Sequence, residues 1–279
     1  MSSSMFAGKT AVITGAGRRQ GLGEAIALRL AEGGAHVVLS DIGQPADAST
    51  PSAMIGGQAG LLGVAEGIRS AGGRVSTQAC DVRRPDEVRA LAAFAVAEFG
   101  SLDIWINNAG IGYLMKPLLE VTAEDWNAVI AVNLSGAFFG LQAAARVMVA
   151  QGRGGRIVNI ASQAAKSGFA MAQAYTASKH GLVGLVRSAA IELGPHGITV
   201  NNVCPNHVTT GLGAWQNEYF AGVQGKTVPQ YLADMAARIP LKRPGLPQDT
   251  AEAVAFLCSD AAGYITAESL NVSGGEEPH

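Results

Sequence analysis

The sequence predicts an α/β fold, in which a doubly wound and mainly parallel sheet of seven strands is covered by helices on both faces. Apolar, β-branched runs alternate with amphipathic stretches from one end of the chain to the other. Strands separated by helices return to the sheet by right-handed crossovers and are buried on both sides. Hydrophobic residues make up 48% of the chain and charged residues only 15%, so a large core can be buried.

The expected elements follow in order along the chain. The strands are Thr10–Thr14, His36–Ser40, Val75–Cys80, Asp103–Ile106, Arg156–Ile160, Ile198–Val203 and Ser269–Val272. The stretches that predict helices are Gly23–Glu32, Pro85–Phe99, Ala123–Ala150, Ala174–Leu193 and Thr250–Leu257. No repeat or linker interrupts this order, and we therefore expect a single domain over residues 1–279.

Two segments depart from the alternation. Ile42–Gly63 is rich in Gly, Ala, Ser and Pro, which predicts an extended loop after the second strand. Residues 209–239 carry several aromatic side chains, Trp215 among them, without strand character. A long connection of this kind in a compact domain is often a binding loop or lid, and we expect it to contact substrate.

Composition narrows the partners and the location. The formal net charge of −2 gives no long-range attraction to nucleic acid or to an anionic membrane. Cys80, Cys204 and Cys258 are scattered without a CxxC pair, which favours structural thiols in a reducing compartment. The N-terminus has no apolar signal region, and we expect no apolar run long enough to span a membrane. A cytoplasmic protein without a metal site is the expectation.

A glycine-rich turn joins the first strand to the first helix. Gly15, Gly21 and Gly23 let the backbone turn sharply, and Leu22 lies at the start of the helix. Such a turn brings a pyrophosphate to the positive end of a helix, as in Rossmann-type dinucleotide sites. The setting between a strand and a helix indicates this function, and a purely structural turn is the alternative.

Asp41 ends the second strand, 18 residues after Gly23. An acid at about 20 residues from the turn reaches the adenosine ribose in such folds. A carboxylate accepts hydrogen bonds from the ribose diol and repels a 2′-phosphate, which favours NAD. Arg18 and Arg19 could hold that phosphate instead, which makes NADP the alternative. It is less favoured because the Asp41 carboxylate would oppose the arginines.

Further candidates follow the third and fourth strands. Asp81, with Val82, comes after the third strand and is expected at the adenine edge, although Asp81 alone is more typical of a helix N-terminus. Asn108, Ala109 and Gly110 follow the fourth strand. Ligands of open α/β sheets collect at the carboxyl ends of strands, and all these turns share that edge.

Tyr175 and Lys179 are four residues apart in a predicted helix and share one face. A nearby ammonium favours the phenolate, so we expect Lys179 to lower the tyrosine pKa toward a useful acid–base range. Taken alone, this spacing is common on surface helices. Ser162 lies at the end of the fifth strand, with twelve residues between it and Tyr175, and Asn133 is an unusual polar choice inside a helix.

Together, these residues resemble the single-domain branch of the short-chain dehydrogenase/reductase family, and the resemblance covers essentially the whole chain. The matching motifs are the glycine turn, Asp81-Val82, Asn107-Asn108-Ala109-Gly110, Asn133, Ser162, Tyr175-Thr176-Ala177-Ser178-Lys179, Pro205 with Thr210, Arg243-Pro244-Gly245-Leu246-Pro247, Phe256-Leu257-Cys258-Ser259-Asp260, Tyr264-Ile265-Thr266 and Gly274-Gly275.

The resemblance implies a role for each catalytic position. Tyr175 would be the general acid–base, and Ser162 would orient and polarise the substrate oxygen. Lys179 would bind the nicotinamide ribose, and Asn133 would hold a water that links Lys179 to solvent. Val208 and Thr210 lie where the family holds the nicotinamide carboxamide.

Three positions depart from the family pattern. Five residues separate Gly15 from Gly21, where the family has three, so Arg18 or Arg19 could touch the pyrophosphate. Asn206 replaces a glycine near the nicotinamide, and the span from Asp41 to Asp81 is longer than usual.

The expected reaction is the NAD-dependent interconversion of a secondary alcohol and its ketone, with a polyol or a cyclic or hydrophobic alcohol as substrate. Gln163 and Trp215 are the expected substrate contacts beside Ser162 and Tyr175; a lid that packs on its own aromatics is the alternative for the Trp215 segment. Family members usually form homotetramers, and a homodimer is the second possibility.

Four rival functions are the alternatives to this reaction. A 3-oxoacyl-thioester reductase-like carbonyl reductase is the nearest alternative. An enoyl-thioester reductase would space Tyr and Lys by seven positions, and an epimerase or dehydratase would need a larger C-terminal substrate domain. A non-catalytic NAD-binding scaffold would predict a damaged tetrad, whereas all four residues are present.

Overall fold

The computed structural model describes residues 4–43, 56–112 and 114–277, and the side chains of residues 211–216 lie outside that description. One sheet contains the strands β1 (Thr10–Thr14), β2 (His36–Asp41), β3 (Val75–Ala79), β4 (Ile104–Asn107), β5 (Gly155–Ile160), β6 (Ile198–Pro205) and β7 (Ser269–Val272). Their order is β3-β2-β1-β4-β5-β6-β7, and every neighbouring pair is parallel. The predicted fold class is confirmed.

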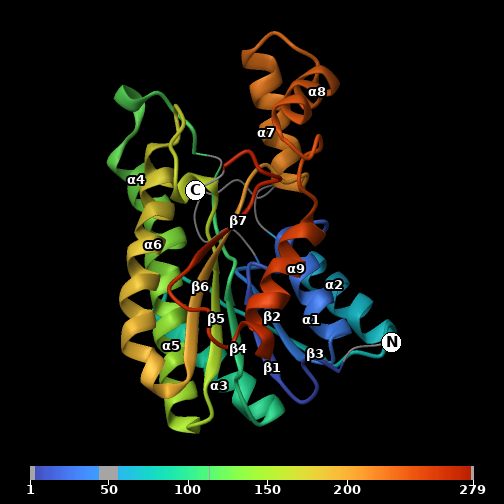
Figure 1. Ribbon diagram of the computed structural model, residues 1–279, viewed down its shortest axis with the longest axis vertical. Coiled ribbons are helices and arrows are strands. Elements are labelled where there is room, and N and C mark those ends of the chain that lie inside the picture. Colours follow the sequence, from blue (N-terminus) through green and yellow to red (C-terminus); the bar gives the residue numbers. More distant parts are fainter. Residues whose placement is uncertain (1–3, 44–55, 113, 278–279) are drawn as a thin grey trace.

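Helices cover both faces of this sheet (Figure 1). They are α1 (Leu22–Glu32), α2 (Gln58–Ser70), α3 (Pro85–Phe99), α4 (Ala123–Ile130), α5 (Ala137–Gln151), α6 (Gln173–Leu193), α7 (Gly211–Val223), α8 (Val228–Arg238) and α9 (Pro247–Cys258). A π-helical turn, Ala131–Gly136, joins α4 to α5. Helices α1, α2 and α9 contribute to one large core cluster, and α3, α5 and α6 contribute to a second.

Alternation along β1 shows how the sheet separates these two cores. Ile13 belongs to the cluster with α1, α2 and α9, whereas its neighbour Val12 belongs to the cluster with α3, α5 and α6. Successive side chains of a strand point to opposite faces, and all five β1 residues are buried. The chain winds outward from β1 to β3 and then resumes at β4 on the other side of β1. A ligand crevice is expected at such a reversal point.

The loop predicted over Ile42–Gly63 is wrong in its last part, because α2 begins at Gln58. Leu61, Val64, Ala65 and Ile68 are buried at helical spacing, and their packing outweighs the low helix propensity of the neighbouring glycines. Residues 44–55 of this segment lie outside the described residues.

The segment predicted as a loop over residues 209–239 contains two helices, α7 and α8, which stand beyond one end of the sheet (Figure 1). Thr227 and Gln230 form a reciprocal capping box at the start of α8, which stabilises a helix N-terminus. Tyr231 and Met235, one turn apart, bury its inner face. The aromatic residues that suggested a loop therefore include the packing face of a helix.

The helical stretch Ala123–Gln151 is long and apolar enough to cross a membrane by length and composition, contrary to the sequence-based expectation. Half of its most apolar window is buried inside the molecule, and α5 packs against the sheet and α3. A core helix of a soluble protein passes the same test, so this stretch is weak evidence for a membrane span.

Candidate active site

A single cleft at the carboxyl ends of the strands brings together all of the predicted cofactor residues. It is lined by Gly15, Arg18, Gly21, Leu22, Gly23, Asp41, Asp81, Val82, Asn108, Ala109, Gly110, Tyr175, Lys179, Val208 and Thr210, together with Ser162. These residues come from the ends of β1 to β6, from the segments that follow them, and from α1 and α6, which are far apart in the sequence. The parallel sheet places them at one edge.

The glycine turn packs against the segment that follows β4, backbone against backbone. A Cβ on Gly15 would lie 2.6 Å from the Ala109 Cα, and a Cβ on Gly23 would lie 2.6 Å from the Gly15 carbonyl oxygen. The Asn108 side-chain amide donates to the carbonyl oxygens of Thr14 at 2.9 Å and Gly15 at 2.8 Å. These contacts hold a bare backbone cradle at the N-terminus of α1, which fits a dinucleotide pyrophosphate.

The glycine turn is two residues longer than the family pattern, and contacts between residues of the turn and the start of α1 hold the longer form. The Gly21 amide donates to the Arg18 carbonyl at 3.2 Å, and Gln20 adopts a positive φ of 57°. Arg19 forms an ion pair with Glu24 at 2.8 Å, away from the cleft lining. Arg18, and not Arg19, lines the cleft.

Asp41 is buried at the end of β2, where backbone amides hold its carboxylate. Gly17 donates to Oδ2 and Ile42 donates to Oδ1, both at 2.8 Å. Burial raises the pKa of Asp41, and these backbone hydrogen bonds act in the opposite direction. Gly56 packs directly over this carboxylate, since a Cβ there would lie 2.6 Å from Oδ2.

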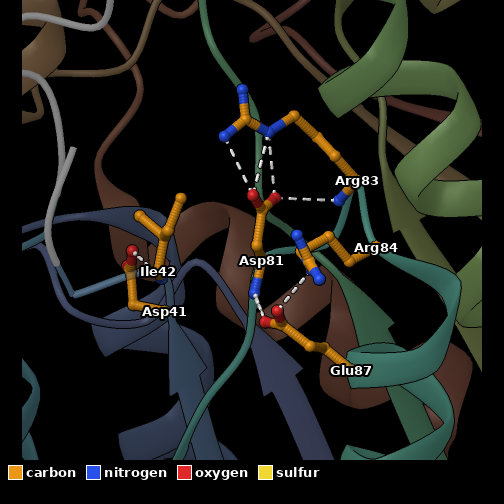
Figure 2. A network of polar contacts seen from close by, with 6 residues as sticks. All are labelled: Asp41, Ile42, Asp81, Arg83, Arg84 and Glu87. Atoms are coloured by element: carbon orange, nitrogen blue, oxygen red, sulfur yellow. Dashed lines mark hydrogen bonds and ion pairs between the residues drawn. The ribbon is translucent and has the colours of Figure 1, made fainter. Parts of the chain in front are cut away.

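Asp81 is paired with Arg83, a cleft residue that the sequence reasoning missed. Arg83 Nε lies 3.0 Å from both carboxylate oxygens, and Nη2 donates to Oδ2 at 2.8 Å. Figure 2 shows the guanidinium folded back onto the carboxylate. The neighbouring Arg84 pairs instead with Glu87 at 2.7 Å, whose carboxylate also accepts from the Asp81 amide at 2.9 Å.

Tyr175 and Lys179 lie on α6 and face the cleft. Lys179 Nζ donates to the Ile160 carbonyl at 2.8 Å and lies 5.5 Å from the centre of the Tyr175 ring. Burial lowers the pKa of Lys179 to about 8. Burial also raises the pKa of Tyr175, while a hydrogen bond with Ser162 opposes this shift.

The expected lowering of the tyrosine pKa by Lys179 is therefore not found. The cause is desolvation: burial destabilises the phenolate and raises the pKa by more than the hydrogen bond with Ser162 lowers it.

Asn133 lies in the π-helical turn, behind the cleft wall, and is 2% exposed. Its Oδ1 accepts from the Ile111 amide, and its Nδ2 donates to the Ile111 carbonyl, both at 2.9 Å. Nδ2 also donates to Ser178 Oγ at 3.2 Å, and Ser178 in turn donates to the Tyr175 carbonyl at 2.7 Å. Asn133 thus links the segment after β4 to α6. Its predicted water-holding role stays a prediction.

The substrate residues predicted beside Ser162 are less closely gathered. Gln163 Nε2 donates to Glu277 at 2.5 Å, and Gln163 is not among the residues that line the cleft. The side chain of Trp215 lies outside the described residues. Asn206 lines the cleft, and its side-chain amide donates to Glu276. The side-chain carboxylates of Glu276 and Glu277 therefore bind the segments that follow β6 and β5.

Several residues that line the cleft were not predicted from the sequence. Most of them are neighbours of predicted residues, and the others lie on segments for which no site was expected. The unpredicted residues are Ile42, Gly56, Cys80, Arg83, Ile111, Gly112, Ala128, Val132, Ile160 and Ala161. Ala128 and Val132 are four residues apart, and the helical spacing next to Asn133 could have identified them. No sequence signal distinguishes Gly56, which reaches the cleft only through tertiary packing.

The buried lysine predicts a pH-dependent stability. The pKa of Lys179 is about 8 in the folded chain against a usual 10.5, so the unfolded chain binds more protons between these values. The cost of burying the ammonium is constant below about pH 8 and disappears as pH rises toward 10.5.

We therefore expect the wild-type free energy of unfolding, minus that of Lys179→Met, to rise across this window. Urea denaturation of both proteins from neutral pH to about pH 10 measures this difference. The buried thiols titrate in both proteins, so their contribution to the free energy of unfolding cancels in this difference. A difference that stays flat with pH would contradict the lowered pKa.

Comparisons with known proteins agree with this geometry. A family model described as Enoyl-(Acyl carrier protein) reductase matches residues 15–277. L-rhamnose 1-dehydrogenase (NAD(P)(+)) of Azotobacter vinelandii is 39% identical over 267 residues, which cover 96% of each chain.

Two solved structures are similar throughout. Carveol dehydrogenase from Mycobacterium avium in complex with NAD has a TM-score of 0.90 at 32% identity and covers 99% of each chain. A single-substitution variant of actinorhodin polyketide ketoreductase with NADPH has a TM-score of 0.88 at 34% identity and covers 100% of each chain.

The similar proteins are named as dehydrogenases and reductases of alcohols and ketones, and the similarity extends over the whole sheet and the cleft. The chain is an oxidoreductase with the cleft of an NAD(P)-binding fold. It belongs to the short-chain dehydrogenase/reductase family.

Proposed function

We propose that this enzyme interconverts a secondary alcohol and its ketone with NAD, using Tyr175 as the acid–base. The observation that carries the proposal is that one cleft contains both the residues expected to bind the dinucleotide and the residues expected to transfer the proton. Asp41 and the glycine turn lie at one end, and Ser162, Tyr175 and Lys179 lie at the other. The dinucleotide, when bound, supplies the hydride acceptor or donor.

The chain's own residues handle the proton. In the oxidative direction, Tyr175 acts in its deprotonated form. Its phenolate oxygen would accept the proton of the substrate hydroxyl as the carbonyl forms, and the hydrogen on the same carbon would leave as hydride to the dinucleotide; in the reverse direction the Tyr175 hydroxyl would return the proton. Ser162 hydrogen-bonds with Tyr175, so a substrate oxygen placed between the two hydroxyls is oriented by both. Lys179 lies beside the ring and, at a pKa of about 8, exchanges its proton near physiological pH.

Asp41 supports NAD over NADP. Its buried carboxylate is fixed by Gly17 and Ile42 and covered by Gly56, so a 2′-phosphate would meet a negative charge in a crowded corner. Arg18, which also lines the cleft, supports the NADP alternative. The similar structures carry NAD in one case and NADPH in the other.

Replacing Asp41 with alanine should shift the ratio of kcat/KM for NAD to that for NADP toward NADP by about 10- to 100-fold, because charged hydrogen bonds contribute roughly 1.5–3 kcal/mol. Asp41→Asn, which keeps the shape, should shift it in the same direction. Steady-state kinetics with both cofactors measure the ratio.

Asp260→Ala is the matched control, since the Asp260 carboxylate is fully exposed and pairs only loosely with Arg156, at 3.7 Å. A ratio that stays unchanged in both Asp41 variants would show that this carboxylate does not read the ribose.

The substrate class follows from the reacting end of the cleft. Gly112 lies against the Tyr175 ring, since an added Cβ there would be 3.2 Å from Tyr175 Cε2. Ile111, Ala128 and Val132 line the same cleft, and these apolar residues suit an apolar or cyclic carbon frame. Sugar and terpenoid alcohols are both represented in the names of similar proteins. A fluorescence screen of NADH formation with secondary alcohols, polyols and their ketones tests the proposal, and turnover of none of them would contradict it.

A carbonyl reductase of 3-oxoacyl thioesters is the second candidate, supported by the match to a polyketide ketoreductase. Turnover of an acetoacetyl thioester in the same screen would favour it. A non-catalytic NAD-binding scaffold would bind NADH and turn over nothing.

We also propose that the chain is one domain, acts in the cytoplasm and assembles as a homotetramer or a homodimer. The large side chains Trp126, Phe138, Val149 and Ile191 are exposed along α4, α5 and α6, which supports assembly through these helices. Light scattering after size exclusion tests the oligomeric state.

A further inference from the structure

We propose that Arg83 forms one wall of the adenine site, where Asp81 holds its guanidinium plane ready to stack on the base. The inference rests on the proposed dinucleotide function and adds a recognition residue to it. Asp81 was the residue expected at the adenine edge; Arg83, two residues on, lines the same cleft.

The pairing fixes the orientation of the guanidinium. Arg83 offers Nε and Nη2 to the carboxylate at 2.8–3.0 Å, and the Arg83 backbone amide donates to Asp81 Oδ1 at 3.0 Å. The side chains are 25% and 13% exposed, so the pair is largely shielded from water. A bidentate pair with a third, backbone contact leaves the planar group little freedom to rotate.

The surroundings suit a flat, neutral ring. Ile42, Cys80 and Val82 line the cleft near the ends of β2 and β3, together with Asp41 and Asp81. Apolar side chains and a planar guanidinium both pack well against a heteroaromatic face, whereas carboxylates at the edge accept hydrogen bonds from an amino group. Adenine presents both features.

A phosphate is the competing ligand for an arginine at this place. The charge of Arg83 is already neutralised by Asp81 at hydrogen-bond distance, and Asp41 adds a second carboxylate to the same end of the cleft (Figure 2). An anion would therefore displace an existing ion pair and approach two negative charges. The geometry favours the base over the 2′-phosphate.

Three ligands separate these roles: NADH, NADPH and reduced nicotinamide mononucleotide, which lacks the adenosine half. We expect Arg83→Ala to raise the Kd of NADH and of NADPH by the same factor, about tenfold, as expected for one stacking contact of a planar cation. The Kd of the mononucleotide should not change. Fluorescence titration of the reduced nicotinamide measures all three without turnover.

Arg84→Ala is the matched control. Arg84 is the next residue, its side chain is 68% exposed, and it pairs with Glu87 rather than with Asp81. We expect its three Kd values to equal those of the wild type. Arg83→Lys, which keeps the charge but not the plane, should behave like Arg83→Ala, and it serves as the second variant if the alanine protein does not fold.

Each other outcome overturns the inference. Unchanged NADH binding in both Arg83 variants would show that the base does not stack there, and an equal loss with the mononucleotide would indicate a general structural effect. A much larger loss for NADPH than for NADH would assign Arg83 to the phosphate. A wild-type protein that binds none of the three ligands would instead overturn the proposed function itself, and this failure is visible before any variant is made.

Discussion

Tyr175→Phe is expected to lower kcat by about 1000-fold while the Kd of NADH stays within about twofold of the wild type, because a positioned acid–base group contributes roughly 100- to 10,000-fold. The change removes only the hydroxyl that hydrogen-bonds with Ser162. The ring remains and keeps its contacts with Phe169, whose ring centre lies 6.5 Å away, and with Lys179. Binding and chemistry should therefore separate cleanly.

Single-turnover kinetics on the best substrate from the screen, with fluorescence titration of NADH, check this result. Tyr264→Phe is the control, because the Tyr264 side chain is fully exposed and lies outside the cleft lining. More than about a tenth of wild-type kcat in Tyr175→Phe would contradict the assignment of the proton to this residue.

Gly15→Ala should destabilise the fold by roughly 3 kcal/mol or more and weaken NADH binding, since left-handed backbone and overpacking each cost about 1–3 kcal/mol. Gly15 has a φ of +67°. Its new Cβ would lie 2.6 Å from the Ala109 Cα and 2.9 Å from the Ala109 nitrogen, and neither backbone atom can move without shifting the end of β4.

Gly152→Ala isolates the steric part of that effect. Gly152 follows α5 with a φ of +66°, and no atom lies within 4 Å of its added Cβ. It shares the backbone strain but not the close contact, so we expect a loss of about 1 kcal/mol and unchanged NADH binding. Urea denaturation gives both free energies of unfolding. Equal losses in the two variants would show that the approach of the turn to Ala109 is not limiting.

The sequence was sufficient for the sheet because each strand carries its own signal. The β1 residues Thr10–Thr14 and the α3 residues Pro85–Phe99 were predicted with the bounds that the structure shows. Helices α2, α7 and α8 were not recognised, since glycine content and aromatic residues hid their helical spacing. There, packing on the rest of the molecule outweighs local propensity.

The candidate site could be predicted for residues that lie at the carboxyl ends of parallel strands and whose side chains suit the chemistry. Asp41, Ser162 and Tyr175 come to one cleft because parallel strands end together. The pairing of Asp81 with Arg83 depends on how a side chain bends back over its own turn, which residue type does not determine. The raised pKa of Tyr175 was missed for the same kind of reason, because burial is a tertiary property.

The π-helical turn at Ala131–Gly136 changes the rotational phase of everything that follows it in the same helical rod. A π-bulge accommodates one extra residue, and one residue corresponds to a rotation of about 100° in an α-helix. Val129 before the turn and Leu141 and Met148 after it are nevertheless all buried. Deleting a single residue here would rotate one half of the rod against the other, so the number of residues in this stretch constrains the packing of α5 independently of which side chains the stretch carries.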